Sequence, residues 1–141
     1  MLKTRSRKPG RSRAGNMIET VCGSIILIIV ALFLVDVAAV VVCQTQNDAL
    51  AKHCARAAAN KDNPGAANSA VAQVIAEFKK TGGGSKICVY DNYNLIYNNG
   101  NAMTMVQTTV TCNFPVPVPL GPSSLQFRAE ALEPIVAILP P

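Results

Sequence analysis

The stretch MIETVCGSIILIIVALFLVDVAAVVVC, Met17 to Cys43, decides the fold of this 141-residue chain. Its only charges are Glu19 and Asp36, and sixteen uncharged residues lie between them. A helix needs about 20 apolar residues to cross the hydrocarbon core of a bilayer. Placing that core at 17–36 leaves the two acids at opposite interfaces, which avoids a cost of about 2.5–3.5 kcal/mol for an acid in mid-membrane. We therefore predict a membrane-spanning helix here.

Basic residues gather in front of this stretch. Six of the 13 Lys and Arg residues lie within 1–13, which holds no acid, so the rest has seven bases against eight acids. Such a leader keeps the N-terminus cytoplasmic and exports the chain beyond the helix, here 44–141. The near-neutral remainder argues against nucleic-acid binding, which needs positive charge on a folded face. With a single His and no carboxylate pair or Cys/His cluster at catalytic spacing, we expect no enzyme, metal or cofactor.

The helix is expected to continue beyond the membrane, because no Pro or Gly interrupts Ser24 to Lys61. The apolar residues 37–43 would then project from the bilayer on a rod of about 40 residues and about 60 Å. An exposed stripe on a rod that cannot fold back predicts packing against other helices. Two other interpretations stay open. One is a cleaved secretory signal peptide, whose apolar region is usually shorter, at roughly 7–15 residues; the other is a simple signal anchor.

The junction between leader and apolar run reads Ala14-Gly15-Asn16-Met17-Ile18-Glu19. A basic leader, this junction and a long aliphatic helix resemble the prepilins of the type IV pilin-like superfamily. Asp36 and the Ala/Arg-rich continuation at 51–59 resemble most closely the TadE-like pseudopilins of tight-adherence (Tad/Flp) pili. The resemblance implies that a prepilin peptidase removes the leader. It also implies that a membrane assembly platform packs the helix into a filament of identical or related subunits.

The family has a Glu at the fifth mature position. Cleavage between Ala14 and Gly15 gives Glu19 that position, whereas cleavage between Gly15 and Asn16 makes it the fourth; relaxed spacing or no cleavage also stay open. The new α-amine, with a reference pKa of about 7.7–8.0, would be largely cationic at neutral pH. Glu19 of a neighbouring helix would neutralise it and fix axial register, since losing one member of a buried ion pair costs about 3–5 kcal/mol. The alternative is a carboxylate that only sits among lipid headgroups.

A turn signal, a short helix and a flexible joint are expected within 61–85. The sequence Asn60–Gly65 stops the long helix. A second helix is predicted over 66–80, with Asn68 or Ser69 as its cap. Its apolar residues recur at helical spacing: Val71, Val74, Ile75 and Phe78. The Gly-rich stretch 82–85 lacks the phosphate-loop pattern and is expected to act as a joint.

Residues 86–141 are expected to form a small β-rich head. Strands are predicted over 86–91 and 102–114, with closing strands over 124–131 and 135–139 and a break at Glu133-Pro134. A three-residue loop at 99–101 would pair residues whose numbers sum to 200, so that Cys88 faces Cys112. This register predicts a disulfide between them outside the membrane, which would stabilise the head by about 2–4 kcal/mol.

Three further cysteines and one histidine need an interpretation. Cys22 lies within the membrane segment and is expected to pack there. Cys43 and Cys54 are about three helical turns apart and cannot pair within one straight helix. Cys54 is therefore either a thiol or a bridge between subunits. His53 points to a different helix face from Cys54, so we predict solvent exposure and no metal site.

Together these patterns predict an α+β chain. It consists of a leader at 1–15, a long helix at 16–60 with a membrane segment at about 17–43, a linker and short helix at 61–85, and a head at 86–141. The resemblance implies a structural pilin or pseudopilin subunit, first single-pass in the inner membrane and then part of an extracellular filament. The alternative is a signal-anchored cell-surface binding module with no filament role, whose function would lie in the head.

Overall fold

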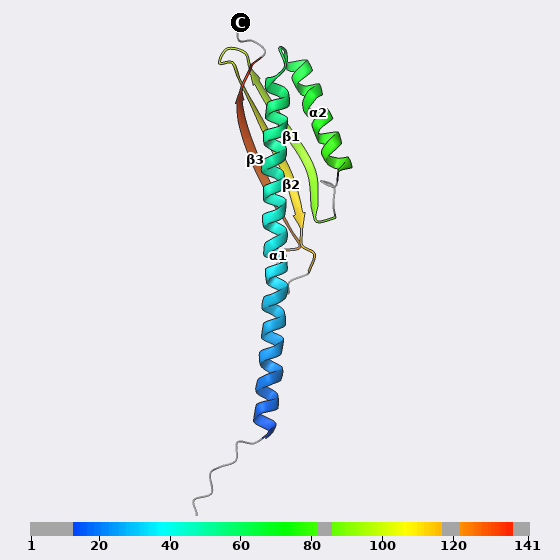
Figure 1. Ribbon diagram of the computed structural model, residues 1–141, viewed down its shortest axis with the longest axis vertical. Coiled ribbons are helices and arrows are strands. Elements are labelled where there is room, and N and C mark those ends of the chain that lie inside the picture. The colour runs from blue at the N-terminus through cyan, green and yellow to red at the C-terminus, as the bar shows by residue number, and fades with distance from the viewer. Residues whose placement is uncertain (1–12, 82–85, 117–121, 137–141) are drawn as a thin grey trace, which may run out of the picture.

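The computed structural model describes residues 13–81, 86–116 and 122–136 (Figure 1). Its elements are α1 (Arg13–Ala59), α2 (Pro64–Lys80), β1 (Cys88–Asn98), β2 (Met103–Asn113) and β3 (Ser124–Pro134). The chain is α+β, as predicted: one long N-terminal helix precedes a small three-stranded antiparallel sheet. Of the predicted leader at 1–15, residues 1–12 lie outside the described residues.

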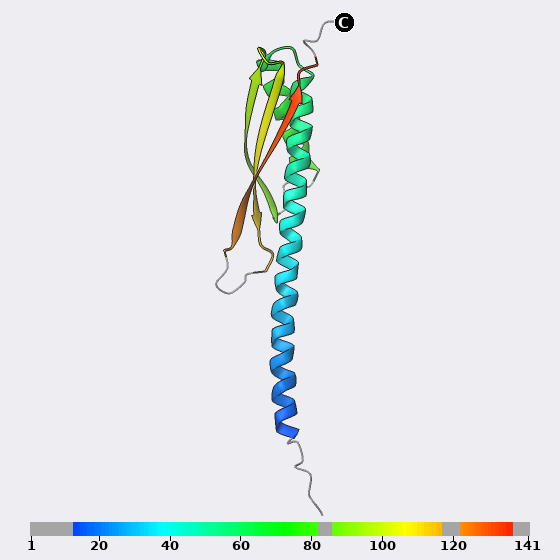
Figure 2. The same ribbon diagram turned by 90° about the vertical axis from the view of Figure 1, so that its left-hand side faces the viewer.

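Helix α1 is one continuous element of 47 residues, about 70 Å long. It begins at Arg13, three residues before the predicted start. Its N-terminal half stands apart from the other described elements, whereas its C-terminal half lies along the sheet and α2 (Figures 1 and 2). The molecule is therefore a rod with a head built onto one end.

One stripe of α1 faces the head. Its buried residues follow the spacing of one helix face, and they are Asp36, Cys43, Asn47, Leu50, Ala51, Cys54, Ala55, Ala58 and Ala59. We expected the apolar stretch 37–43 to need other helices for cover. For Cys43 that is wrong, because it is buried against the chain's own sheet. Val37, Val41 and Val42 are exposed, and their cover by other helices stays a prediction. The small side chains of the stripe let the sheet and α2 approach closely.

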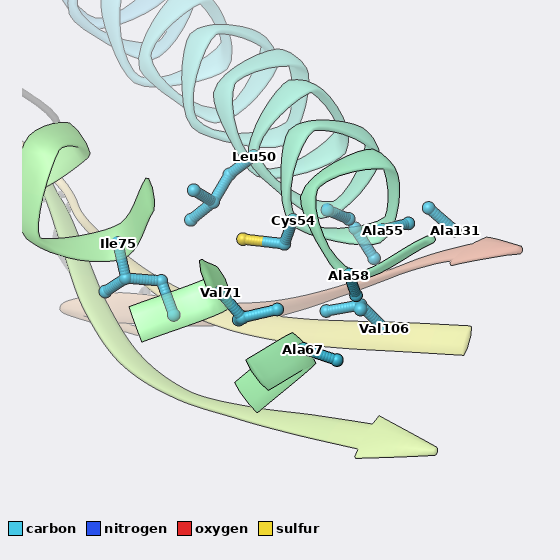
Figure 3. Close-up of a cluster of buried hydrophobic side chains, with 11 residues drawn as sticks. Leu50, Cys54, Ala55, Ala58, Ala67, Val71, Ile75, Val106 and Ala131 are labelled. Carbon is cyan, nitrogen blue, oxygen red and sulfur yellow. The ribbon is translucent and has the colours of Figure 1, made fainter. Parts of the chain in front are cut away.

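Helix α2 folds back beside α1 and closes the main core. Val71 and Ile75 are buried, and they gather with Cys54 and Ala58 of α1 (Figure 3). The predicted apolar stripe of this helix is confirmed, because Val74 and Phe78 are also packed against the core. The predicted cap is wrong: Asn63 caps α2, with its Oδ1 accepting a hydrogen bond from Ala66 N at 2.7 Å. Proline directly after Asn63 favours that start, since its fixed φ suits a first helical position.

The sheet is a meander with β2 in the centre. Alternate residues of β2 face α1 and are buried: Thr104, Val106, Thr108, Val110 and Cys112. The closing strand differs from prediction, because β3 runs unbroken through Glu133 to Pro134. Pro134 is tolerated as the last residue of an edge strand. No strand forms at Ile135 and Val136, and residues 137–139 of the predicted last strand lie outside the described residues.

The hairpin between β1 and β2 reaches the predicted cysteine register by another route. Asn98 pairs with Met103, so the loop has four residues instead of three, and the numbers of paired residues sum to 201. A β-bulge between Tyr90 and Asn92 takes up one extra residue and returns the sum to 200. Cys88 therefore pairs with Cys112 as predicted, although the loop length behind that prediction was wrong.

Candidate functional site

The largest feature outside the head is the apolar surface of α1. Every large hydrophobic side chain from Met17 to Val37 is exposed, and so are those of Val41 and Val42. This segment makes α1 long and apolar enough to cross a membrane, with little of it buried inside the chain. Leaving so much apolar surface in water is unfavourable at about 25 cal/mol per Å². A bilayer or other apolar helices must therefore cover it.

Glu19 is an exposed acid at the N-terminal end of that surface. Both candidate cleavage bonds, Ala14–Gly15 and Gly15–Asn16, lie in the first turns of α1. Helix ends open at little cost in free energy, so these bonds are among the easiest in α1 to expose. Glu19 follows Gly15 by about one turn, or about 6 Å along the axis. An amine at Gly15 and this carboxylate therefore occupy neighbouring levels of the rod.

Asp36, at the other end of that surface, is covered by the chain's own head. Its side chain is only 4% exposed, because the base of the head packs over it. One carboxylate oxygen, Oδ1, accepts a hydrogen bond from Val116 N at 3.3 Å. The other, Oδ2, is buried and has no hydrogen-bond partner within the described residues. Asp36 thus marks the point where α1 meets the head.

An apolar cavity of about 330 Å³ borders Asp36. It is lined by Phe33, Asp36, Val37 and Val40 of α1 and by Phe114, Pro122 and Leu125 of the head. All of its lining side chains except Asp36 are apolar. The cavity therefore lies between the exposed apolar part of α1 and the base of the head.

Three cysteines gather where α1 meets the base of the sheet. Cys43, Cys88 and Cys112 are each at most 1% exposed and share one small cluster with Val110. All three are thiols in the structure, so the Cys88–Cys112 disulfide stays a prediction. Burial raises the pKa of the Cys112 thiol to about 12, and it raises that of Cys88 as well. We did not foresee the approach of Cys43, because pairing across the hairpin says nothing about the helix above it.

Cys54 and His53 lie apart from this cluster. Cys54 is fully buried between α1 and α2, so in this fold it is a core residue with no surface for a bridge between subunits (Figure 3). Its burial raises the pKa of the thiol to about 11. His53 is exposed, as predicted. In the described part of the chain, no group of three or more His, Cys, Asp or Glu side chains could hold a metal ion.

Sequence reasoning missed Asn47, the buried polar residue at the middle of the stripe. Its position was readable, because 36, 40, 43, 47, 50 and 54 follow the three- and four-residue spacing of one helix face. Its hydrogen-bond partners were not, since they lie 61 and 80 residues further along the chain. No family model, curated protein or solved structure matches this sequence.

Proposed function

We propose that this chain is a structural, non-catalytic subunit of a type IV pilin-like filament, of the TadE-like kind. In this proposal α1 spans the inner membrane with its N-terminus in the cytoplasm and loses its leader to a prepilin peptidase. The assembly platform then moves it into a filament, where α1 packs against α1 of identical or related subunits. The observation that carries the proposal is the exposed apolar surface of α1. In this proposal lipid covers that surface before assembly, and the helices of neighbouring subunits cover it afterwards.

The extent of that surface favours a filament over a simple anchor. From Met17 to Val42 it covers about 39 Å of helix, whereas a hydrocarbon core is about 30 Å thick. Val41 and Val42 are 57% and 52% exposed and lie beyond a membrane core placed at 17–36. An anchor would leave these two side chains at the interface or in water. In a filament, neighbouring helices would cover them.

Glu19 has a defined task in this proposal. Outside the bilayer, the α-amine of a mature subunit needs a carboxylate partner, and Glu19 of a neighbour would supply one. That pairing fixes the axial position of one subunit against the next. The exposed position of Glu19 is compatible with such a contact. The alternative, a headgroup-level acid, needs no partner subunit.

The first experiment follows the chain in the cell that encodes it. Intact-mass spectrometry of shear-released filaments and of membranes is expected to show chains that lack residues 1–14 or 1–15. Glu19→Ala is expected to insert and be processed but to reduce the shear-released fraction at least tenfold. Glu19→Asp, which keeps the carboxylate, should lose less, and Ala49→Ser on the exposed face of α1 serves as the neutral control.

Three results would count against the proposal. An intact leader on every molecule would favour the signal-anchored binding module. Normal filament yield from Glu19→Ala would remove the register role of Glu19. A mature chain that starts beyond α1's apolar segment would indicate a secreted protein instead.

A further inference from the structure

The cluster of Cys43, Cys88 and Cys112 brings together three elements of the fold. Cys43 comes from α1, Cys88 from the start of β1 and Cys112 from the end of β2. The Cys43 thiol donates to Ile87 O at 3.6 Å, directly beside Cys88 in the chain. The three cysteines also share one buried cluster with Val110. Cys43 therefore packs beside both strand cysteines.

Any two of these three neighbouring cysteines can form a disulfide, and the third cysteine then remains beside that bridge. We propose that Cys43, Cys88 and Cys112 form a thiol–disulfide exchange site, in which Cys43 bridges α1 to one of the two strand cysteines. In this proposal the Cys88–Cys112 disulfide forms when Cys43 has been replaced. This inference goes beyond the proposed function, and in the cell it needs only that the head reaches an oxidising compartment.

The chemistry balances with a disulfide-bearing oxidant, such as glutathione disulfide or an exported protein oxidant. The Cys43 thiolate attacks one sulfur of that disulfide, forms a mixed disulfide and releases one oxidant thiolate. A strand cysteine thiolate then attacks the Cys43 sulfur, forms the internal bridge and releases the second oxidant thiolate. Two cysteines are oxidised, the oxidant's disulfide is reduced to two thiols, and the two cysteine protons end on those thiols.

The remaining thiol permits exchange within the site. Its thiolate attacks either sulfur of the bridge, forms a new disulfide and releases the displaced cysteine as a thiolate, with no net oxidation. Burial of the cluster slows this attack in the folded chain, because it disfavours the thiolate. The bridge is therefore chosen during folding and is then protected from reductants outside. A bridge from Cys43 encloses residues 44–87 or 44–111, far more chain than the hairpin bridge encloses.

Such a bridge has a mechanical consequence. Cys43 is buried on the stripe of α1 that the base of the sheet covers. A covalent bond from Cys43 to the sheet holds the head to the helix at that point. A bridge within the hairpin leaves the head held on α1 by packing and hydrogen bonds alone.

The test uses the full chain, purified in detergent, unfolded in denaturant and refolded in a glutathione redox buffer. Remaining thiols are alkylated, and the disulfide is mapped by mass spectrometry of peptides. The wild-type bridge is expected to contain Cys43 in most molecules. Cys43→Ser should move it to Cys88–Cys112, Cys88→Ser should give Cys43–Cys112, and Cys112→Ser should give Cys43–Cys88. Cys54→Ser, in the separate core, should leave the wild-type map unchanged.

A wild-type map with only Cys88–Cys112 bridged and Cys43 alkylated would overturn the proposal. So would complete alkylation of all thiols in both Cys88→Ser and Cys112→Ser, with circular dichroism showing the native fold. The disulfide map of the wild-type chain tests the proposal even if the variants fail to fold. Because the measurement is made on purified chain, loss of filaments in the cell would not affect it, and a missing Cys43 bridge would leave the filament proposal standing.

Discussion

Asn47 shows how one residue fixes the position of α1 on the sheet. Its Nδ2 donates to Phe127 O at 3.1 Å and to Thr108 O at 3.4 Å, and its Oδ1 accepts from Thr108 Oγ1 at 2.7 Å. The residue is only 1% exposed, so water cannot replace these partners. Apolar packing alone lets a helix slide along a sheet, whereas directed hydrogen bonds hold it at one level.

Asn47→Ala is expected to lower the free energy of unfolding by about 1–3 kcal/mol, because Thr108 Oγ1 and two sheet carbonyls lose a buried partner. Denaturant unfolding of the purified chain in detergent measures this. Asp48→Ala, at the exposed neighbouring position, is the matched control and should change stability by less than about 0.5 kcal/mol. Equal effects from the two variants would contradict the role of Asn47.

Cys54 gives the fold a pH dependence of known sign. Burial raises the pKa of its thiol from 9.0 to about 11, so between these values the unfolded chain loses a proton that the folded chain keeps. Stability from this group is therefore complete below pH 9 and is lost as the pH rises towards 11, by roughly 2–3 kcal/mol. Tyr90, with a pKa raised to about 12, adds to the loss above pH 10.

Cys54→Ala is expected to flatten the fall in stability between pH 9 and pH 11. Unfolding free energies of wild type and variant, measured at steps across this range, give the difference. The variant's own cost at neutral pH is a constant offset and does not affect the slope. Parallel curves for the two proteins would show that Cys54 does not carry this pH dependence.

At the scale of elements, the contact among α1, α2 and the sheet depends on small side chains. Ala55 and Ala58 of α1 are fully buried, and they face Val106, Ala131 and α2 (Figure 3). Because alanine side chains are small, α1, α2 and the sheet can approach one another closely at Ala55 and Ala58. A larger side chain would have to push one of these elements away.

Ala55→Leu is therefore expected to destabilise the head by about 1–3 kcal/mol through overpacking. Ala49→Leu is the control, because Ala49 lies on the exposed face of the same helix and has room. Thermal unfolding followed by circular dichroism compares the two variants. If Ala55→Leu were as stable as Ala49→Leu, the core would be looser than the structure describes.

Local patterns predicted both helices and the central strand, but not every bound. The first strand was expected over 86–91 and runs over Cys88–Asn98, and the cap of α2 was placed too far along the chain. The long apolar run and the absence of Pro and Gly from Ser24 to Lys61 identified α1, and helical spacing identified the apolar stripe of α2. The Cys88–Cys112 register was predicted from a loop one residue too short, and a bulge at Asp91 compensated. Asp91 Oδ2 accepts hydrogen bonds from Thr111 at 2.6 Å and Gln126 at 3.2 Å, contacts across three strands that no local pattern reveals.

At the scale of the whole molecule, α1 divides into a part that packs into the head and an apolar part that is exposed. Beyond Asp36 the buried stripe of α1 packs against the head, while the apolar surface before Asp36 is left exposed by the other described elements. The sequence predicted that surface, because hydropathy is local. It could not predict that Asp36 would be covered, since the covering residue Val116 is 80 positions away. The exposed apolar part of α1 and the head therefore meet at one buried carboxylate.

The central claim is that the apolar surface of α1 exchanges lipid for copies of its own kind. A photo-crosslinking amino acid in place of Ile29, which is 57% exposed in the middle of that surface, tests it most directly. The account predicts crosslinked multimers joined through α1 in the shear-released fraction, and none from the same probe at Glu77 on the exposed face of α2. Only single chains and lipid adducts from position 29, in every fraction, would contradict it.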